Sequence, residues 1–215
     1  MNLVYINSAN GLSKAALETV TYAKKLGADV AVITNGTASA DQLASLGAYG
    51  ASTVLQDSSV DGQDPSQLVK MVAAAAQKVG ASTIIFSHDL IGKAVAPRLS
   101  VRLKAGLVAG AVALPEANGS IKVNVFSGKA FGYVSVNSSV RIISLLPNSI
   151  QPEQTGSNCG VEASDSQAGS SAITVKATKK PEGAIPLPEA ELVVSAGRGL
   201  KGPENWGMVE ELATA

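Results

Sequence analysis

The chain has 215 residues, of which 46% are hydrophobic and 16% are charged. This length supports one large domain or one and a half ordinary ones, and a charged share well below the roughly 25% of an average globular chain excludes global disorder. The 17 lysines and arginines balance the 17 aspartates and glutamates, so the net charge is zero and no strong field attracts nucleic acid or anionic lipid.

The first hundred residues alternate between short apolar runs and longer amphipathic stretches, which is typical of βα units around a parallel sheet. The runs are rich in valine and isoleucine, as expected of strands that are covered on both faces. The predicted strands are Leu3 to Asn7, Asp29 to Thr34, Thr53 to Gln56 and Thr83 to Ser87.

Helices are predicted between these strands from apolar side chains at spacings of three and four residues. Asp64 and Pro65 mark the start of one helix, because aspartate caps the free N–H groups of the first turn and proline lacks the N–H that would be unpaired there. The apolar positions that indicate the helices are Ala16, Val20 and Ala23 before Gly27, and Leu68, Met71, Val72, Ala75 and Val79 before Gly80.

The pattern changes after Leu107. Ile121, Val123 and Val125 alternate with polar residues, and turn residues at 127–128 and 137–139 separate two further β-rich runs that end near Pro147. Alternation interrupted by such turns predicts an antiparallel meander.

The last third of the chain begins with polar connectors. The segment Gln151 to Gly169 is poor in large apolar residues, and the segment Thr178 to Ala190 carries three prolines, which exclude a helix. A strand is predicted between them, at Ala172 to Ala177. Glu191 to Ser195 is predicted as a buried strand, followed by a turn and a helix from about Pro203 to the end.

These elements predict an α/β fold with three layers, helices covering both faces of a mainly parallel sheet. It is of the Rossmann-like or adenine-nucleotide-hydrolase-like class, with the antiparallel meander added. The predicted organisation is an N-terminal α/β domain over 1–150, a connector with one strand over 151–190, and the truncated start of a second α/β domain over 191–215.

Composition also bears on the compartment. Cys159 is the single cysteine, which excludes an intrachain disulfide and a multi-cysteine metal site and fits a reducing environment. The N-terminus runs directly into the first predicted strand without the features of a targeting segment, and no apolar run reaches the roughly 18 residues of a membrane span. We therefore expect a cytoplasmic protein without membrane insertion.

Gly197, Arg198 and Gly199 lie directly after the last predicted strand and before the last helix. Glycines in this place let backbone N–H groups approach a phosphate, and an arginine at a strand's carboxyl edge can pair with phosphate through two hydrogen bonds. A plain turn is an equally good explanation of the glycines, because the third glycine of a dinucleotide fingerprint and the Lys-Ser/Thr ending of a P-loop are missing. These residues are candidates for cofactor binding.

No catalytic set can be assembled from the motifs. His88 and Asp89 follow a predicted strand and could in principle do acid–base chemistry, but capping of the next helix by Asp89 is the favoured interpretation. Cys159 has no neighbouring base, and Ser8 to Gly11 has neither a basic residue nor a glycine repeat before Lys14. We predict a turn at Ser8 to Gly11, an incidental exposed thiol at Cys159, and no catalytic residue.

One predicted helix carries a cluster of four basic residues, Lys93, Arg98, Arg102 and Lys104. Such a cluster can mark a docking surface for an acidic partner. A solvated helix face is the commoner explanation, so both interpretations stay open.

Three stretches carry a family resemblance: Gly92-Lys93-Ala94-Val95-Ala96-Pro97-Arg98-Leu99, Phe126-Ser127-Gly128-Lys129-Ala130-Phe131, and Leu192 to Asn205. In sequence, order and spacing they resemble the alpha subunit of electron transfer flavoproteins. The third stretch is the most specific, because it is similar to that family's strand, glycine–arginine turn and helix start. Ala196 departs from the pattern, since the family commonly has glycine at this position.

The resemblance implies an electron carrier rather than an enzyme. In this family an FAD held with a beta subunit takes electrons from flavoprotein dehydrogenases and passes them to a quinone-linked or other acceptor. The arginine of the turn contacts the FAD, so the resemblance assigns Arg198, with Gly197 and Gly199, to cofactor binding. It also implies that the N-terminal domain mainly holds the beta subunit. Because the family's later FAD ligands would follow Ala215, we expect this chain alone to lack FAD.

A second interpretation is an adenine-nucleotide-binding regulatory module that resembles universal stress proteins, in which the first βα turns grip ATP or AMP. Titration with adenine nucleotides distinguishes it from the first interpretation, which predicts capture of the beta subunit.

Overall fold

The structure, a computed structural model, describes residues 1–9, 11–177, 187, 190 and 192–215. These residues form two compact units, Met1–Lys176 and Ala177–Ala215. The first unit continues beyond residue 150, where the predicted N-terminal domain ends, and includes much of the predicted connector. The rest of that connector, 178–186 with 188–189, lies outside the described residues.

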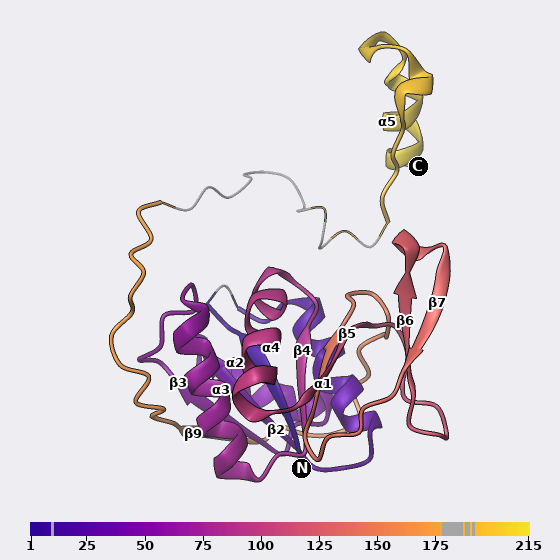
Figure 1. Cartoon of the computed structure of the whole chain (residues 1–215). Coiled ribbons are helices and arrows are strands. Elements are labelled where there is room, and N and C mark those ends of the chain that lie inside the picture. The colour runs from indigo at the N-terminus through magenta and orange to yellow at the C-terminus, as the bar shows by residue number, and fades with distance from the viewer. Residues whose placement is uncertain (10, 178–186, 188–189, 191) are drawn as a thin grey trace. The chain divides into compact units, whose positions relative to one another are not determined.

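The described residues of the first unit form a nine-stranded sheet in the order β7-β6-β5-β8-β4-β1-β2-β3-β9 (Figure 1). The four strands predicted in the first hundred residues are confirmed to within one residue at each end. β1 pairs in parallel with both β2 and β4, so the chain builds the sheet first to one side of β1 and then to the other. The confirmed strands are β1 (Asn2–Asn7), β2 (Val30–Asn35), β3 (Thr53–Asp57) and β4 (Thr83–Ser87).

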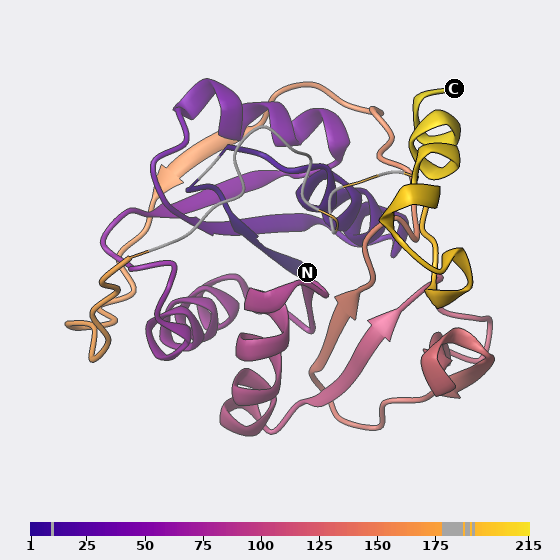
Figure 2. The ribbon, with the colours of Figure 1, turned by 90° about the horizontal axis from the view of Figure 1, so that it is seen from above.

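Helices cover both faces of this sheet, which confirms the predicted three-layer α/β fold (Figure 2). Alternate residues of one strand enter different cores, because successive side chains of a strand point to opposite faces. Leu3 and Tyr5 of β1 pack in the core beneath α3 (Pro65–Val79) and α4 (Leu90–Leu103). Val4 and Ile6 pack in the opposite core with α1 (Lys14–Lys25), α2 (Ala40–Ala44) and the 3-10 helix η1 (Ser45–Tyr49).

The predicted start of α3 is also confirmed. The Asp64 side chain accepts a hydrogen bond from the N–H of Ser66 at 2.8 Å, and Pro65 occupies the first helical position. Local capping chemistry therefore accounts for the position of this boundary.

The predicted antiparallel meander is correct for two strands and wrong for a third. β6 (Ile121–Val125) and β7 (Ala130–Val134) form an antiparallel hairpin that extends the sheet beyond β5 (Gly106–Ala111). β8 (Arg141–Leu145) instead inserts between β4 and β5 and is parallel to both. The reason is burial: Ile142 and Ile143 enter the cores on opposite faces of the sheet, as a central parallel strand requires.

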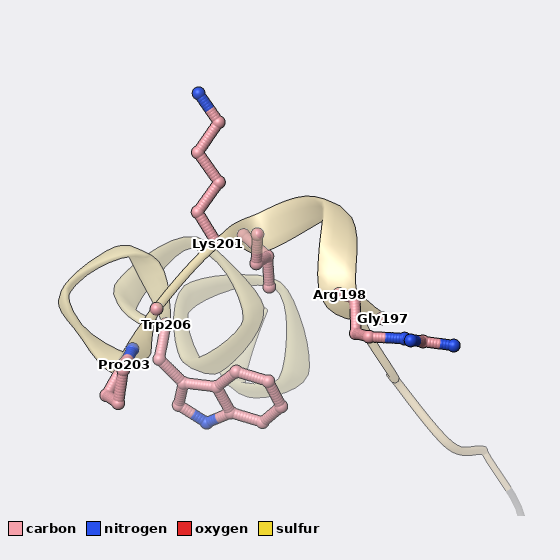
Figure 3. A pocket seen from close by; sticks show the side chains of 7 residues that line it. Gly197, Arg198, Lys201, Pro203 and Trp206 are labelled. Carbon is pink, nitrogen blue, oxygen red and sulfur yellow. The ribbon is translucent and has the colours of Figure 1, made fainter.

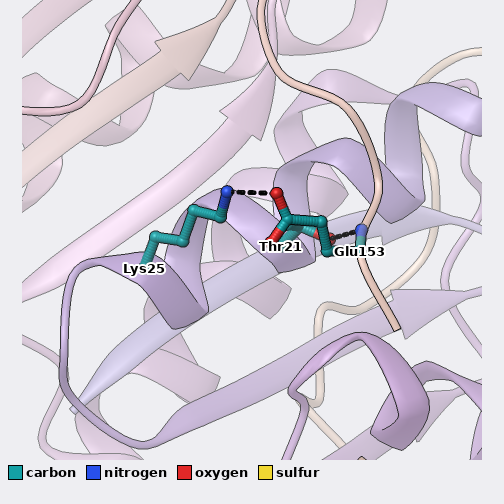
Figure 4. Close-up of polar contacts among 3 residues, drawn as sticks. All are labelled: Thr21, Lys25 and Glu153. Carbon is teal, nitrogen blue, oxygen red and sulfur yellow. Dashed lines mark hydrogen bonds and ion pairs between the residues drawn. The ribbon is translucent and has the colours of Figure 1, made fainter. Parts of the chain in front are cut away.

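The segment 151–171, which we call the strap, is bound to the first unit rather than forming a free connector. Its backbone hydrogen bonds to Ala48 and Ala44, and its strand β9 (Gly160–Ala163) pairs in parallel with β3. Glu153 contacts α1 twice: its carboxylate pairs with Lys25 at 2.6 Å and its N–H donates to Thr21 Oγ1 at 3.2 Å (Figure 4). The strand predicted at Ala172 to Ala177 is wrong, because these residues pair with no strand.

Two buried carboxylates fasten the distal part of the strap. Asp57 accepts hydrogen bonds from Ser59 and from the N–H of Ser166. Burial opposes ionisation of Asp57, but these hydrogen bonds outweigh it and lower its pKa. Asp64 accepts a hydrogen bond from the Ser171 hydroxyl at 2.8 Å, which is the main reason that its pKa is also lowered.

The second unit contains the 3-10 helices η4 (Arg198–Leu200) and η5 (Pro203–Asn205), followed by α5 (Gly207–Thr214). A helix near the end of the chain is confirmed, but α5 begins at Gly207, four residues after the predicted start near Pro203, where the chain forms η5. The buried strand predicted at Glu191 to Ser195 is wrong for its described part, where Leu192 is 85% exposed; Glu191 lies outside the described residues. Among residues 192–215 there is no second strand that could pair with it, and a lone strand cannot satisfy its backbone groups.

Candidate functional site

The turn that contains Gly197, Arg198 and Gly199 forms η4 and is exposed. Neither glycine has a positive φ, and a Cβ added to either would meet no atom within 4 Å. Neither backbone conformation nor packing in the described residues therefore requires glycine here. The backbone of this turn is open to close approach by another group.

The side chains of this turn line a depression, as Figure 3 shows. The Arg198 guanidinium extends away from the turn, and Lys201 points in another direction, so the two cations do not converge (Figure 3). The indole of Trp206 lies beneath the turn and supplies an apolar wall. The residues that line the depression are Gly197, Arg198, Leu200, Lys201, Gly202, Pro203 and Trp206.

Asn205 holds the turn in shape. Its side-chain amide donates to the Leu200 carbonyl at 2.8 Å, and its backbone N–H donates to the Gly202 carbonyl at 3.2 Å. Lys201 between them has a φ of 67° and a ψ of −50°, a positive-φ conformation that is uncommon for residues other than glycine, and the Gly202 N–H donates across it to the Leu200 carbonyl at 2.8 Å. The arrangement presents Arg198 to solvent from a turn closed by local hydrogen bonds.

The carboxyl edge of β1 and β2, where a nucleotide-binding sheet would receive its ligand, is filled by the chain's own polar groups. The Ser8 hydroxyl donates to the Asn35 carbonyl at 2.6 Å, and the Tyr5 hydroxyl donates to Asn35 Oδ1 at 2.8 Å. Gly62 lies so close to Asn35 that a Cβ at this position would overlap the Asn35 amide nitrogen. The predicted turn at Ser8 to Gly11 is confirmed for its described residues, with Gly11 N–H donating to the Ser8 carbonyl; Asn10 lies outside them.

His88 and Asp89 take structural roles. Asp89 Oδ1 accepts the N–H of Gly92 at 2.7 Å and caps α4, as predicted. His88 Nδ1 lies 2.9 Å from the hydroxyl of Ser144, a buried residue of β8. Burial lowers the pKa of His88, and the charge of Lys93 adds to that effect, so the neutral imidazole is favoured.

Cys159 is half-buried in the strap, which differs from the predicted exposed thiol. Its Sγ contacts the Ala44 carbonyl at 3.6 Å, and burial raises its pKa. A raised pKa reduces the thiolate fraction and therefore the reactivity. The basic residues predicted to cluster on one helix do so on α4, where all four side chains are exposed.

The hairpin of β6 and β7 exposes aromatic side chains that sequence reasoning missed. Phe131 and Tyr133 lie on the solvent face of β7, and Phe126 at the tip is 79% exposed. Phe126 and Ser127 both have φ near 55°, so the tip carries an aromatic residue in a left-handed conformation. The available signal was the run Ala130 to Val134, which is apolar or aromatic on both faces where a half-covered antiparallel strand should have one polar face.

Two further properties of the described residues concern membranes and metal ions. The described residues include no helix with the length and hydrophobicity that crossing a bilayer requires. They also bring together no group of three histidine, cysteine, aspartate or glutamate side chains that could hold a metal ion.

Residues 2–180 match the family model described as "Electron transfer flavoprotein domain". The chain belongs to the electron transfer flavoprotein family. Two of the three stretches that indicated this family, on α4 and on the hairpin, lie inside the matched residues, whereas the Gly197 to Gly199 turn lies outside them.

Individual relatives extend the similarity to electron transfer flavoproteins into the second unit. An electron transfer flavoprotein subunit alpha from Mycobacterium leprae is 30% identical over 220 residues, covering 98% of this chain and 68% of the relative. The subunit alpha from Bacillus subtilis is 27% identical over 172 residues, covering 77% of this chain and 53% of the relative. The probable mitochondrial subunit alpha from Caenorhabditis elegans is 25% identical and covered to 62%. The chain thus spans 53% to 68% of the length of these relatives.

Proposed function

We propose that this chain is the alpha-type subunit of a heterodimeric electron transfer flavoprotein and acts as an electron carrier rather than an enzyme. In this proposal the unit Met1–Lys176 binds a beta subunit, and the turn around Arg198 contributes to an FAD site. The flavin, when bound, supplies the redox chemistry. The observation that carries the proposal is the aromatic hairpin at an edge of the sheet in a chain that belongs to the electron transfer flavoprotein family.

The hairpin has the properties of a permanent protein interface. Among the described residues of the first unit, β7 is the last strand on its side of the sheet, so its outer backbone groups have no strand partner there and can pair with a strand of another chain. Phe131 and Tyr133 supply large contact areas beside that edge. Lys122 lies 3.7 Å from the centre of the Phe131 ring, and this cation–π contact holds the ring in position. The inner face of the hairpin is anchored by Val123, which is buried in the core with α1.

The turn around Arg198 fits an FAD phosphate in its chemistry. Its guanidinium can donate two parallel hydrogen bonds to phosphate oxygens, and the glycines on both sides leave the backbone accessible. Arg198 would therefore hold and orient the diphosphate.

The alternative of an adenine-nucleotide-binding module has less support. A nucleotide would have to displace the contacts that Asn35 makes with Ser8, Tyr5 and Gly62. The Tyr5 hydroxyl is buried, and burial together with the negative charge of Asp89 raises its pKa. It therefore remains a neutral donor, already committed to Asn35.

The hairpin interface can be tested by co-producing the chain with its beta subunit. We expect Phe131→Ser to weaken the complex by about 2 kcal/mol, or roughly 30-fold in Kd, as truncation of a central aromatic contact does. Isothermal titration or analytical ultracentrifugation measures this change. Ile173→Ser is the matched control, because Ile173 is also exposed but lies outside the hairpin. Equal affinity of the two variants would contradict the proposed interface.

The FAD site can be tested in a protein extended to the length of the relatives and assembled with its beta subunit. We expect Arg198→Ala to raise the Kd for FAD by about 10- to 100-fold, the loss expected for hydrogen bonds to a charged group. Arg198→Lys should be intermediate, since lysine cannot make the bidentate contact, and Lys201→Ala is the control for lost charge. The purified 215-residue chain should show no flavin absorption; stoichiometric FAD on it would overturn this part of the proposal.

A further inference from the structure

The outer face of α4 has a composition that the fold does not explain. The inner face places Val95, Ala96 and Leu99 in the core. On the outer face, Leu90 is 86% exposed and Val101 is 81% exposed, although neither side chain gains anything from solvent. The helix and its C-cap carry four basic residues, and between 90 and 104 there is no aspartate or glutamate.

Helical geometry arranges these residues in an ordered pattern. At about 100° per residue, Leu90, Pro97 and Val101 fall within roughly 40° of one another, and the stripe is about 16 Å long. Lys93 lies to one side of this stripe, with Lys104 at the C-cap on the same side, and Arg98 and Arg102 lie to the other. The outer face is therefore an apolar stripe flanked by cations on both sides.

The cations of this face are not used within the fold. In the part of the chain that the structure describes, no ion pair joins Lys93, Arg102 or Lys104 to a carboxylate. Arg98 donates from its guanidinium to the Ala94 carbonyl of its own helix. The carboxylate nearest in sequence, Asp89, accepts the N–H of Gly92 and serves as the helix cap. On a chain whose net charge is zero, this concentration of positive charge is a local property of α4.

We propose that the outer face of α4 is the docking surface for an acidic redox partner, a protein whose carboxylates surround a small apolar centre. The proposal rests on the proposed function of the chain in electron transfer. Flanking cations speed encounter with an acidic surface and orient it, and the stripe of Leu90 and Val101 gives the encountered complex a short-range contact. A narrow, charged face of this kind suits a transient redox encounter, whereas the aromatic hairpin suits a permanent subunit.

The experiment uses the full-length protein assembled with its beta subunit and FAD. The probe is a flavoprotein dehydrogenase from the same organism, first shown to reduce the assembled protein. Arg102→Glu and Val101→Ser are compared with Lys24→Glu, an exposed charge reversal on α1, which covers the opposite face of the sheet. The steady-state rate at which the dehydrogenase reduces the assembled protein is measured over a range of NaCl concentrations.

We expect Arg102→Glu to raise the KM for the partner about five- to tenfold at low salt with kcat unchanged, the scale on which steering alters association. The difference should shrink as salt rises, because the Debye length falls to about 3 Å at 1 M. Val101→Ser should raise KM at all salt concentrations, and Lys24→Glu should leave it unchanged. This combination of results supports the docking surface.

The other outcomes overturn it in distinguishable ways. An unchanged KM in Arg102→Glu, with flavin and heterodimer intact, contradicts the docking surface alone. Loss of flavin or beta subunit in the α4 variants, but not in Lys24→Glu, means that an internal interface covers this face. Binding of the assembled protein to phosphatidylserine vesicles that is lost in Arg102→Glu, with no effect on KM, assigns the face to a membrane instead. A wild-type protein that takes up neither flavin nor beta subunit contradicts the proposed function and, with it, this proposal.

Discussion

Gly92→Ala is expected to destabilise the first unit by about 3 kcal/mol or more, at the upper end of the range for overpacked positions. Gly92 lies in the first turn of α4, where alanine would normally be favoured by about 1 kcal/mol. Here a Cβ would overlap the backbone carbonyl oxygen of Ser87, at the end of β4. Because that oxygen belongs to a central strand, it cannot move without disturbing the sheet, so the clash outweighs the helix propensity.

The measurement is chemical denaturation of the purified chain, followed by far-UV circular dichroism. Gly160→Ala is the matched control, since a Cβ at Gly160 meets nothing within 4 Å and its φ is not positive; its effect should stay within about 0.5 kcal/mol. A loss of less than about 1 kcal/mol in Gly92→Ala would show that α4 can shift away from β4 at little cost.

Gly47→Ala is expected to release the strap. A Cβ at Gly47 would overlap the Ser157 carbonyl oxygen and the Cys159 backbone nitrogen, so the two backbones can no longer approach as they do. The hydrogen bond from Cys159 N–H to the Ala44 carbonyl, 3.0 Å in the native structure, would be lost with that contact. We expect a loss of about 2 kcal/mol and roughly 30-fold faster proteolysis within 151–171, if cleavage follows the population of the open strap.

Mass spectrometry of the first cleavage products locates the released segment. Glu153→Ala serves as the comparison, because it removes the ion pair with Lys25, a contact between partly exposed side chains that contributes less than about 1 kcal/mol. If Glu153→Ala opened the strap more than Gly47→Ala did, side-chain pairing and not close backbone packing would be what fixes it.

The parallel half of the fold could be predicted from local sequence because its signals are local. Continuous valine and isoleucine runs gave the strands from Asn2 to Ser87, and Asp64 with Pro65 gave a helix start to the residue. β8 resembled the hairpin strands in composition, and its parallel insertion between β4 and β5 depends on pairing with residues nearly 60 positions away. A run of five residues encodes neither the direction of its strand in the sheet nor the strands that will lie beside it.

The strap and the hairpin surface escaped prediction for different reasons. β9 is a short strand with one partly buried residue, Val161. It forms because β3, about 100 residues before it in the chain, offers N–H and carbonyl groups for pairing. The hairpin strands were predicted, but exposure of Phe131 and Tyr133 depends on which face the core covers. Arg198 was predicted from the sequence as a cofactor-binding residue, and the structure places it in the exposed turn η4. Its assignment to FAD binding remains a proposal.

The two ends of the sheet differ in a way that bears on how large an assembly can grow. β9 covers β3 and ends the sheet with a four-residue strand that carries the charged side chain of Glu162, features that discourage addition of another strand. β7 ends the other side of the sheet, and its exposed aromatic side chains favour addition of another strand. A sheet that can be extended at one end alone accepts one partner and then stops, which favours a closed pair over open-ended fibres.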